Sequence, residues 1–254
     1  MKQREKVIWG VIGAGDVCEV KSVPGMYKTE HSEVKMIMRR NAEKAAGFAR
    51  RHGIKHWTTD VNEIQNDPDI NIIYISTPPD SHCELTLKAA AAGKAVYVEK
   101  PMANTTEECQ KMIEACRKAG VPLFVAYYRR ALPGFNKLRE IIASGAIGKV
   151  RFVNIEMYRT PRPYDYNTEG NWRILPGISG GGYFHDMASH QLDYLDSVFG
   201  PVVKANGIAV NQAGLYPADD MVSASLLFES GVVGTGTWCF TTDTYSEKET
   251  ITIL

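Results

Sequence analysis

Short apolar runs alternate with helical segments along the first half of the chain. The apolar runs predict strands at residues 6–13, 34–38, 71–77, 95–101 and 121–127. Segments with helical periodicity separate most of them, at residues 41–53, 81–94 and 104–120. Because strands that are apolar on both sides must be covered on both faces, this alternation predicts a parallel sheet between two layers of helices.

Capping residues mark the boundaries of these predicted helices. Two pairs fit the capping box, in which a hydroxyl and a carboxylate satisfy free backbone N–H groups: Ser81 with Glu84, and Thr105 with Glu108. Gly93 and Gly120 stand where helices commonly end in a left-handed residue.

The pattern changes after about residue 124. Helices are expected at residues 132–145 and 186–200, with an irregular segment at 159–182. Strand-like runs are expected at residues 149–158, 202–211, 221–230, 231–240 and 247–254. Strands with little helix between them predict an α+β domain with an antiparallel sheet. We therefore expect two domains, residues 1–124 and 125–254, the second incomplete because the chain stops within an alternating strand pattern.

The composition narrows the class of protein. Apolar residues make up 44% of the chain and charged residues 23%, as in ordinary globular proteins. The 29 basic residues balance the 29 acidic ones, which argues against nucleic acid or an anionic membrane as the main partner. No run approaches the roughly 18 apolar residues of a membrane span. Asp16 and Glu19 follow the first apolar run too soon for a signal peptide, so we expect a soluble protein.

The cysteines suggest a compartment. There are five of them, an odd number without a C-x-x-C pair, at positions 18, 83, 109, 116 and 239. This pattern favours reduced thiols in a cytoplasmic protein over a disulfide framework.

A glycine-rich turn follows the first predicted strand. Gly13, Gly15 and Cys18 have the spacing G-x-G-x-x-G/A, in which the first glycine makes a tight turn and the second lets backbone approach a pyrophosphate. The third position needs a small residue for helix–strand packing, and cysteine is small but unusual there. With Asp16 and Val17 at the helix start, the turn predicts a dinucleotide site; a glycine turn without a ligand is the alternative.

The end of the second predicted strand bears on the choice of nucleotide. An NAD site usually has Asp or Glu there to bind the ribose hydroxyls, but this chain has Arg39, followed by Arg40. Two cations just before a helix N-terminus oppose the helix dipole unless an anion such as a 2′-phosphate joins them. The arginines therefore favour NADP(H) over NAD(H). The alternative is a solvated pair of surface arginines.

Four stretches of the chain together resemble the glucose–fructose oxidoreductase / inositol dehydrogenase / MocA (Gfo/Idh/MocA) family. They are GVIGAGDV, ISTPPDSHCELTLKAAAAGKAVYVEKP, YRRALPGFNKLREIIASGAIGKV and SGGGYFHDMASHQLDYLDSVFG. The resemblance implies a Rossmann domain followed by a domain with a large, mostly antiparallel sheet. It also implies oxidation or reduction of sugars, polyols or related diols with NAD(P), by a homodimer or homotetramer that assembles through that sheet.

The resemblance implies a set of cofactor-side residues. Three match the loop that lines the nicotinamide and its ribose: Thr77, Pro78 and His82. Glu99 and Lys100 match the Glu-Lys-Pro signature, whose lysine contacts both cofactor and substrate. In relatives a cis bond often precedes the proline, which here is Pro101. Lys100 also follows a parallel strand at the edge where open α/β sheets bind ligands; a solvated lysine at a strand end is the alternative.

Asp186 and His190 are the candidate acid–base pair, and the resemblance implies the same role. They are four residues apart, so on an α-helix both project from one face, whereas His185 points elsewhere. A carboxylate beside an imidazole raises its basicity, which suits a base that takes a hydroxyl proton. A capping aspartate near a partly buried histidine is the structural alternative. A metal site including Asp193 lacks a cysteine or second histidine on that face, so we expect no metal.

Candidate substrate contacts precede this helix. Residues 158–173 hold several aromatic and arginine side chains without a core-like period, among them Trp172 and Arg173. Such side chains suit polyol rings, although an oligomer contact or a flap would use the same composition. Tyr128 matches a substrate-contacting position at which many family members have a smaller polar residue.

These observations predict an oxidoreductase that moves hydride between nicotinamide C4 and a carbinol carbon of a sugar, polyol or diol. In the oxidation direction, His190 takes the hydroxyl proton, Asp186 orients His190, and Lys100 hydrogen-bonds the reacting oxygen. Two alternatives share the fold: a glycoside hydrolase that retains its cofactor, and a dinucleotide-sensing regulator without chemistry.

Overall fold

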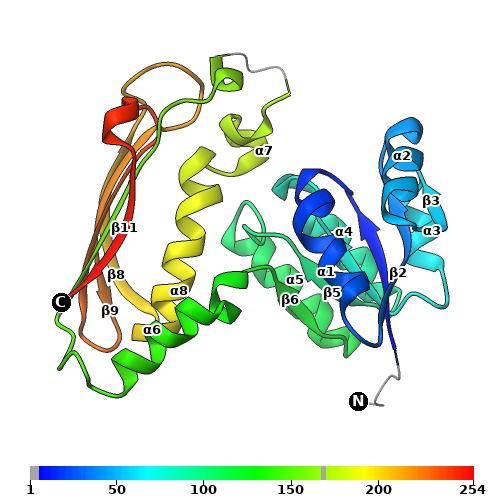
Figure 1. The fold of residues 1–254 in the computed structure, drawn as a ribbon, viewed down its shortest axis with the longest axis horizontal. Helices are drawn as coiled ribbons and strands as arrows, with labels where there is room; N and C mark the ends of the chain where they lie inside the picture. The colour runs from blue at the N-terminus through cyan, green and yellow to red at the C-terminus, as the bar shows by residue number, and fades with distance from the viewer. Residues whose placement is uncertain (1–5, 167–169) are drawn as a thin grey trace. The chain divides into compact units, whose positions relative to one another are not determined.

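The computed structural model describes residues 6–166 and 170–254. Its chain divides into two compact units, Met1–Ala126 and Tyr127–Leu254 (Figure 1). In the part of the chain that is described, no helix is long and apolar enough to cross a membrane.

The first unit contains a six-stranded parallel sheet in the order β3-β2-β1-β4-β5-β6. Its strands are β1 (Val7–Ile12), β2 (Ser32–Met38), β3 (His56–Thr58), β4 (Ile72–Ile75), β5 (Ala95–Val98) and β6 (Leu123–Val125). The helices are α1 (Val23–Lys28), α2 (Ala42–His52), α3 (Val61–Asn66), α4 (His82–Ala91) and α5 (Thr106–Ala119). The predicted doubly wound parallel sheet is confirmed. The hydrophobic pattern does not predict β3 and α3, which are too short to show a period.

Neighbouring residues of one strand point into two separate cores, as a sheet covered on both faces requires. Ile12 belongs to a core shared with α3, α4 and α5, whereas Val11 belongs to a core shared with α1 and α2. This alternation explains why the strands are apolar on both sides.

The strand order places a topological switch between β1 and β4. The chain runs from β1 outward through β2 and β3, then returns to the other side of β1 at β4. In open α/β sheets, ligands bind at the carboxyl ends of the strands flanking such a point. The segments after β1, β2, β4 and β5 are therefore the ones that can form a site.

Helix capping agrees with the sequence in part. Thr105 accepts a hydrogen bond from the Glu108 N–H, and Gly120 ends α5 with a left-handed φ of 66°. The predicted capping box at Ser81 is wrong, since its side chain makes no cap hydrogen bond with α4. A 3₁₀ turn, Pro79–Ser81, leads into α4 and turns the Ser81 hydroxyl back towards Thr77.

The second unit contains a five-stranded sheet in the order β11-β7-β10-β9-β8, and side chains of α6 and α8 share its hydrophobic core. The strands are β7 (Phe152–Tyr158), β8 (Val202–Val210), β9 (Met221–Phe228), β10 (Val233–Cys239) and β11 (Lys248–Ile253). The helices are α6 (Pro133–Ala143), α7 (Pro176–Ser179) and α8 (Ser189–Phe199). Only β7 and β10 pair in parallel among the described strands of this sheet, so the prediction of a mostly antiparallel sheet is confirmed.

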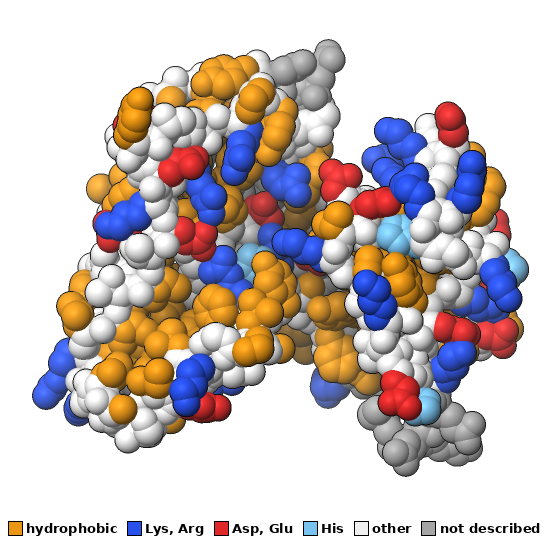
Figure 2. Space-filling view, in the orientation of Figure 1, with side chains coloured by type: hydrophobic (Ala, Val, Ile, Leu, Met, Phe, Trp, Pro, Cys, Tyr) orange, Lys and Arg blue, Asp and Glu red, His pale blue; other side chains and the backbone are white. Residues whose placement is uncertain are grey.

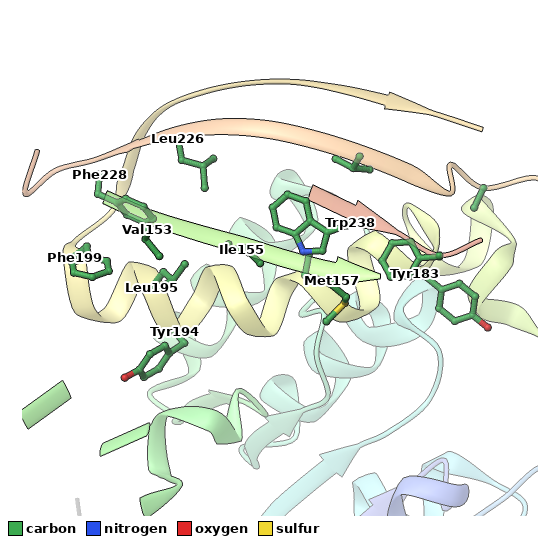
Figure 3. Packing of buried hydrophobic residues seen from close by; sticks show 14 of the residues in the cluster. Val153, Ile155, Met157, Tyr183, Tyr194, Leu195, Phe199, Leu226, Phe228 and Trp238 are labelled. Atoms are coloured by element: carbon green, nitrogen blue, oxygen red, sulfur yellow. The ribbon is translucent and has the colours of Figure 1, made fainter. Parts of the chain in front are cut away.

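The core of this unit lies between α8 and the sheet. Figure 3 shows Leu195 and Phe199 of α8 facing side chains of the strands above them. The Trp238 ring on β10 lies over Gly236, where an added Cβ would come within 2.1 Å of the ring. The Trp238 indole N–H donates to Gln191 at 2.7 Å, which ties the sheet to the residue next to His190. The core therefore fixes the rotation of α8 and the direction in which His190 points.

The segment expected to be irregular contains two 3₁₀ turns, Pro163–Tyr166 and Trp172–Ile174, followed by the single turn of α7. Residues 167–169 of this segment lie outside the described residues. Basic and acidic side chains are interspersed on the visible face of each unit (Figure 2), in keeping with the balanced net charge.

Candidate functional site

The turn after β1 requires glycine at its first position. Gly13 has a left-handed φ of 87°, and a Cβ there would approach the Thr77 backbone nitrogen to 2.8 Å. At Gly15 an added Cβ would meet only the Gly13 carbonyl oxygen, at 3.6 Å. Gly15 therefore leaves open space beside the helix that begins at Asp16 and Val17. A turn of this kind fits a dinucleotide, whose pyrophosphate needs close approach to backbone N–H groups.

Cys18 occupies the third position of the motif and is fully buried. Its Sγ lies 3.1 Å from the Ser76 hydroxyl, so this side chain packs the first helix against the end of β4. Burial is the main reason that the pKa of the Cys18 thiol rises to about 12. The thiol is thus a neutral packing group.

Four successive strand ends bring the candidate cofactor residues into one row. Backbone hydrogen bonds run from Gly13 N to Met38 O, Ser76 N to Ile12 O, and Glu99 N to Ile75 O, at 2.8–3.1 Å. The glycine turn, the Thr77–Pro78 loop and Glu99–Lys100 consequently follow neighbouring strands at the carboxyl edge of the sheet.

Arg39 and Arg40 follow β2 beside this row. Gly13 N donates to the carbonyl of Met38, so Arg39 comes directly after a residue that contacts the glycine turn. Arg39 is half-buried and Arg40 exposed. Within residues 6–166 and 170–254, neither guanidinium forms an ion pair. Both residues follow β2 at the carboxyl edge of the sheet, where open α/β sheets bind ligands.

His82 lies behind the Thr77 loop rather than at its surface. The ring is fully buried; Nε2 lies 2.8 Å from the Thr77 carbonyl oxygen, and Nδ1 lies 3.1 Å from that of Pro101. Burial lowers the pKa of His82, against the opposing effect of these carbonyl contacts. The expected direct contact with the cofactor does not fit this burial. His82 instead holds the loop after β4 to the loop after β5.

This burial predicts a pH effect. The folded protein keeps His82 neutral, whereas the unfolded chain takes up a proton below the ordinary pKa of 6.5. The stability is therefore complete above that pH and falls as the pH drops below it. Between about pH 7.5 and about pH 5.5, urea-unfolding midpoints should fall more for the wild type than for His82→Gln. The exposed His56→Gln variant is the control, and equal pH dependence in all three proteins would contradict the expectation.

Glu99 and Lys100 follow β5, and the Lys100–Pro101 peptide bond is cis, as the family resemblance implies. The Tyr74 hydroxyl donates to Glu99 Oε1 at 2.5 Å and lies 2.8 Å from Ser22 Oγ. The other carboxylate oxygen of Glu99 accepts from the Lys100 N–H at 3.2 Å. Tyr74 and Ser22 are not among the residues that the sequence predicts for the site. The one sequence feature that could have indicated Tyr74 is its hydroxyl within a strand that otherwise consists of isoleucine.

The helix that carries Asp186 and His190 is not a regular α-helix. Phe184–Ala188 forms a π-helical turn, and α8 begins at Ser189. A π turn holds more residues than an α turn. The prediction that Asp186 and His190 share one face, which holds for residues four apart on a regular α-helix, therefore does not apply directly to this segment. Such turns are frequent at functional sites in helices.

The glycine triplet gives this helix a tight entry. Gly180 and Gly182 both have left-handed φ angles, and a Cβ on Gly182 would come within 2.6 Å of Ala218 Cβ. Ser179 Oγ accepts from the Gly182 N–H, and His185 Nδ1 lies 2.9 Å from the Ser179 carbonyl oxygen. His185 therefore closes this turn.

Asp186 is buried and contacts one of the candidate substrate residues. Its Oδ2 accepts from Arg173 Nε at 3.2 Å. The Arg173 guanidinium also lies over the Trp172 ring, 4.5 Å from its centroid. The second unit thus brings Asp186, Arg173 and Trp172 together.

His190 is buried beside two tyrosines. The ring centroids of Tyr128 and His190 are 5.0 Å apart, and those of Tyr127 and His190 are 6.1 Å apart, both edge to face. The family resemblance indicates Tyr128 but not Tyr127. An aromatic surround of this kind shields an imidazole from water on those sides.

Asp193 forms an ion pair with Arg130. Arg130 Nε and Nη2 donate to its two carboxylate oxygens at 2.7 Å and 2.6 Å, which fixes the Tyr128–Ala131 turn against α8. Among the described residues, no group of three or more His, Cys, Asp or Glu side chains is placed to hold a metal ion.

The strand order, the glycine turn and the loops at the carboxyl edge define a dinucleotide-binding protein of the Rossmann class with a second α+β unit. The model of an oxidoreductase family with an NAD-binding Rossmann fold matches residues 7–127, and that of the GFO/IDH/MocA C-terminal domain matches residues 135–254. The chain therefore belongs to the Gfo/Idh/MocA family and is an NAD(P)-binding oxidoreductase.

Individual relatives agree with this assignment. Oxidoreductase P35 of Formosa agariphila is 42% identical over 251 residues, covering 98% of this chain and 76% of that protein. The 1,5-anhydro-D-fructose reductase of Ensifer adhaerens is 33% identical over 239 residues, covering 92% and 69%. The structure of levoglucosan dehydrogenase with NADH and levoglucosan superposes with a TM-score of 0.86 at 29% identity, covering 98% of this chain and 70% of that one.

Proposed function

We propose that this oxidoreductase moves hydride between NADP(H) and a carbinol carbon of a sugar or polyol. The observation that carries the proposal is the row of strand ends that aligns Gly13, Thr77 and Glu99–Lys100 at one edge of the sheet. Similarity to a levoglucosan dehydrogenase and an anhydrofructose reductase supports a carbohydrate substrate.

The chain's own residues would divide the work between them. A bound nicotinamide cofactor supplies the hydride acceptor or donor. Gly13, Gly15, Asp16 and Val17 would hold its pyrophosphate, and Thr77, Pro78 and Glu99 its nicotinamide ribose. Lys100 would donate a hydrogen bond to the reacting oxygen and stabilise the charge that develops there.

Proton transfer is assigned to the second unit. His190 would take the hydroxyl proton in the oxidation direction, and the rings of Tyr127 and Tyr128 would hold its imidazole in place. Asp186 and Arg173 would form the polar side of the substrate site. The Trp172 ring provides an apolar face for a pyranose or polyol chain.

Fluorescence titration with NADPH and NADH, followed by a panel of sugars and polyols, tests the proposal. We expect reversible, substrate-dependent cofactor turnover. Release of an aglycone without net cofactor reduction would instead indicate glycoside hydrolysis. Tight cofactor binding without turnover of any substrate would indicate a dinucleotide sensor.

The preference for NADP(H) rests on the two arginines after β2. A hydrogen bond to a charged group contributes about 1.5–3 kcal/mol, so Arg39→Ser should raise the Kd for NADPH by about 10- to 100-fold and leave that for NADH nearly unchanged. Arg50→Ser, at an exposed position late in α2, is the matched control. The levoglucosan dehydrogenase structure contains NADH. The Kd values of the wild type for NADPH and for NADH therefore decide which nucleotide this chain prefers. Equal affinity of the wild type for NADPH and NADH would show that the two arginines do not select NADP(H).

We also propose a cytoplasmic homodimer or homotetramer. The five cysteines are free thiols, which suits a reducing compartment. Strand β8 is exposed along nearly its whole length, with Val203 59% and Ile208 70% exposed. Apolar side chains on an uncovered strand are typical of a surface that a second copy buries.

A further inference from the structure

A buried carboxylate lies within the second unit, away from Asp186 and His190 in sequence. Asp165 is 1% exposed. Its Oδ1 accepts from the Tyr183 hydroxyl at 2.5 Å and from Asn171 Nδ2 at 2.7 Å, and its Oδ2 accepts from the Arg162 N–H at 2.7 Å. A buried carboxyl group without hydrogen-bond partners is costly, so three donors within 2.7 Å make this a specific arrangement.

Each side-chain donor lies within three residues of a residue of the proposed substrate site. Asn171 precedes Trp172, and its Oδ1 accepts from the Arg173 N–H at 3.3 Å. Tyr183 directly precedes the π-helical turn that carries Asp186. Asp165 therefore joins the start of the segment bearing Arg173 to the start of the segment bearing Asp186.

The tyrosine is held firmly in its donor role. Its ring packs against Phe240 and Tyr216, with centroid distances of 5.6 Å and 6.1 Å. Burial first, and then the hydrogen bond to Asp165, raises the pKa of Tyr183, so the hydroxyl keeps its proton.

The guanidinium of Arg173 is the group whose orientation depends on this arrangement. Nε bonds Asp186, and the flat face lies over Trp172. In the described part of the chain, its Nη atoms have no protein hydrogen-bond partner. They are therefore free to donate to neighbouring hydroxyls of a polyol, provided that the backbone on both sides stays fixed.

We propose that Asp165, Asn171 and Tyr183, here called the Asp165 cluster, are positioning residues that aim Arg173 at a polyhydroxylated substrate. The inference rests on the proposed function and deepens it by assigning substrate affinity to a buried cluster. The cluster acts through Arg173 and does not touch the substrate.

Two phenylalanine substitutions in the same core test the inference. Tyr183→Phe removes the hydroxyl that bonds Asp165. Tyr216→Phe removes a neighbouring hydroxyl that has no hydrogen-bond partner among the described residues. Tyr183→Phe should raise the KM for the polyol by about 10-fold or more, with a smaller change in kcat and an unchanged Kd for NADPH. Tyr216→Phe should leave all three within about twofold.

A double-mutant cycle separates positioning from general loosening of the fold. In an Arg173→Ala background, Tyr183→Phe should add no further increase in KM, because the group through which it acts is absent. An additive effect, or equal behaviour of Tyr183→Phe and Tyr216→Phe, would overturn the inference.

Failure of the proposed function would be seen separately, as a wild-type chain that turns over no sugar or polyol. Hydrogen exchange at the Arg173 amide, which bonds Asn171 Oδ1, still decides the inference in that case. Faster exchange in Tyr183→Phe than in Tyr216→Phe supports positioning of Arg173. Equal exchange in the two variants rejects it.

Discussion

Replacing Lys100 with methionine should lower kcat by about 10²- to 10⁴-fold while leaving the Kd for the nucleotide nearly unchanged. Methionine keeps most of the length and apolar stem of lysine and removes only the ammonium group. The ammonium is the part that would stabilise charge on the reacting oxygen. The backbone N–H of Lys100, which bonds Glu99, is retained in this variant.

The measurement pairs steady-state turnover with fluorescence titration of NADPH. Lys118→Met, at an exposed position late in α5, controls for the loss of one positive charge. Near-full turnover in Lys100→Met would show that the lysine has no part in the chemistry. A parallel loss of nucleotide affinity would instead indicate a binding role.

The second large effect is expected at His190. His190→Asn should lower kcat by about 10²- to 10⁴-fold and remove the acidic limb of the pH–rate profile for substrate oxidation, since that limb reports protonation of the base. Nucleotide affinity should persist, because the candidate nucleotide residues all belong to the first unit.

His185→Asn is the matched control within the same segment. His185 bonds the Ser179 carbonyl, so this variant should lose some thermal stability but keep its turnover and its pH profile. If both variants lost turnover equally, the effect would lie in the shape of the segment rather than in the acid–base chemistry of His190.

Elements that show a strong local pattern could be predicted from the sequence. The strand ends after β1, β4 and β5 are marked by glycine, proline and charged residues directly after apolar runs, so the alignment of these loops at one edge of the sheet was predictable. The capping roles of Thr105 and Gly120 could be predicted because each depends only on residues a few positions away in the sequence. The short β3 has only three residues, fewer than two full periods of a strand, and could not be recognised.

Partnerships between distant residues could not be predicted in the same way. Tyr74 and Glu99 are separated by 25 positions, and Arg130 and Asp193 by 63. A hydrophobic pattern indicates that a side chain is buried but not which polar group it meets there. For the same reason the hydrogen bonds of the Asp165 cluster could not be predicted. The capping role predicted for Ser81 is wrong because the Ser81 hydroxyl donates within its own loop and does not cap α4.

Irregular backbone was the other source of error. On a uniform α-helix Asp186 and His190 would project from one face, but the segment begins with a π turn. Propensities of individual residues distinguish these two helical forms poorly, because a π turn within an α-helix is maintained by tertiary contacts. Here the π turn lies between Tyr183 and α8, and both pack in the core beneath the sheet.

Cys18 has a consequence for the chemical resistance of the nucleotide site. Alkylating reagents and peroxides attack the thiolate, and both the raised pKa and the complete burial of Cys18 suppress that form. The cysteine at the glycine turn should thus be among the slowest of the five to be modified. Oxidants should therefore leave the close packing of the glycine turn on the end of β4 intact.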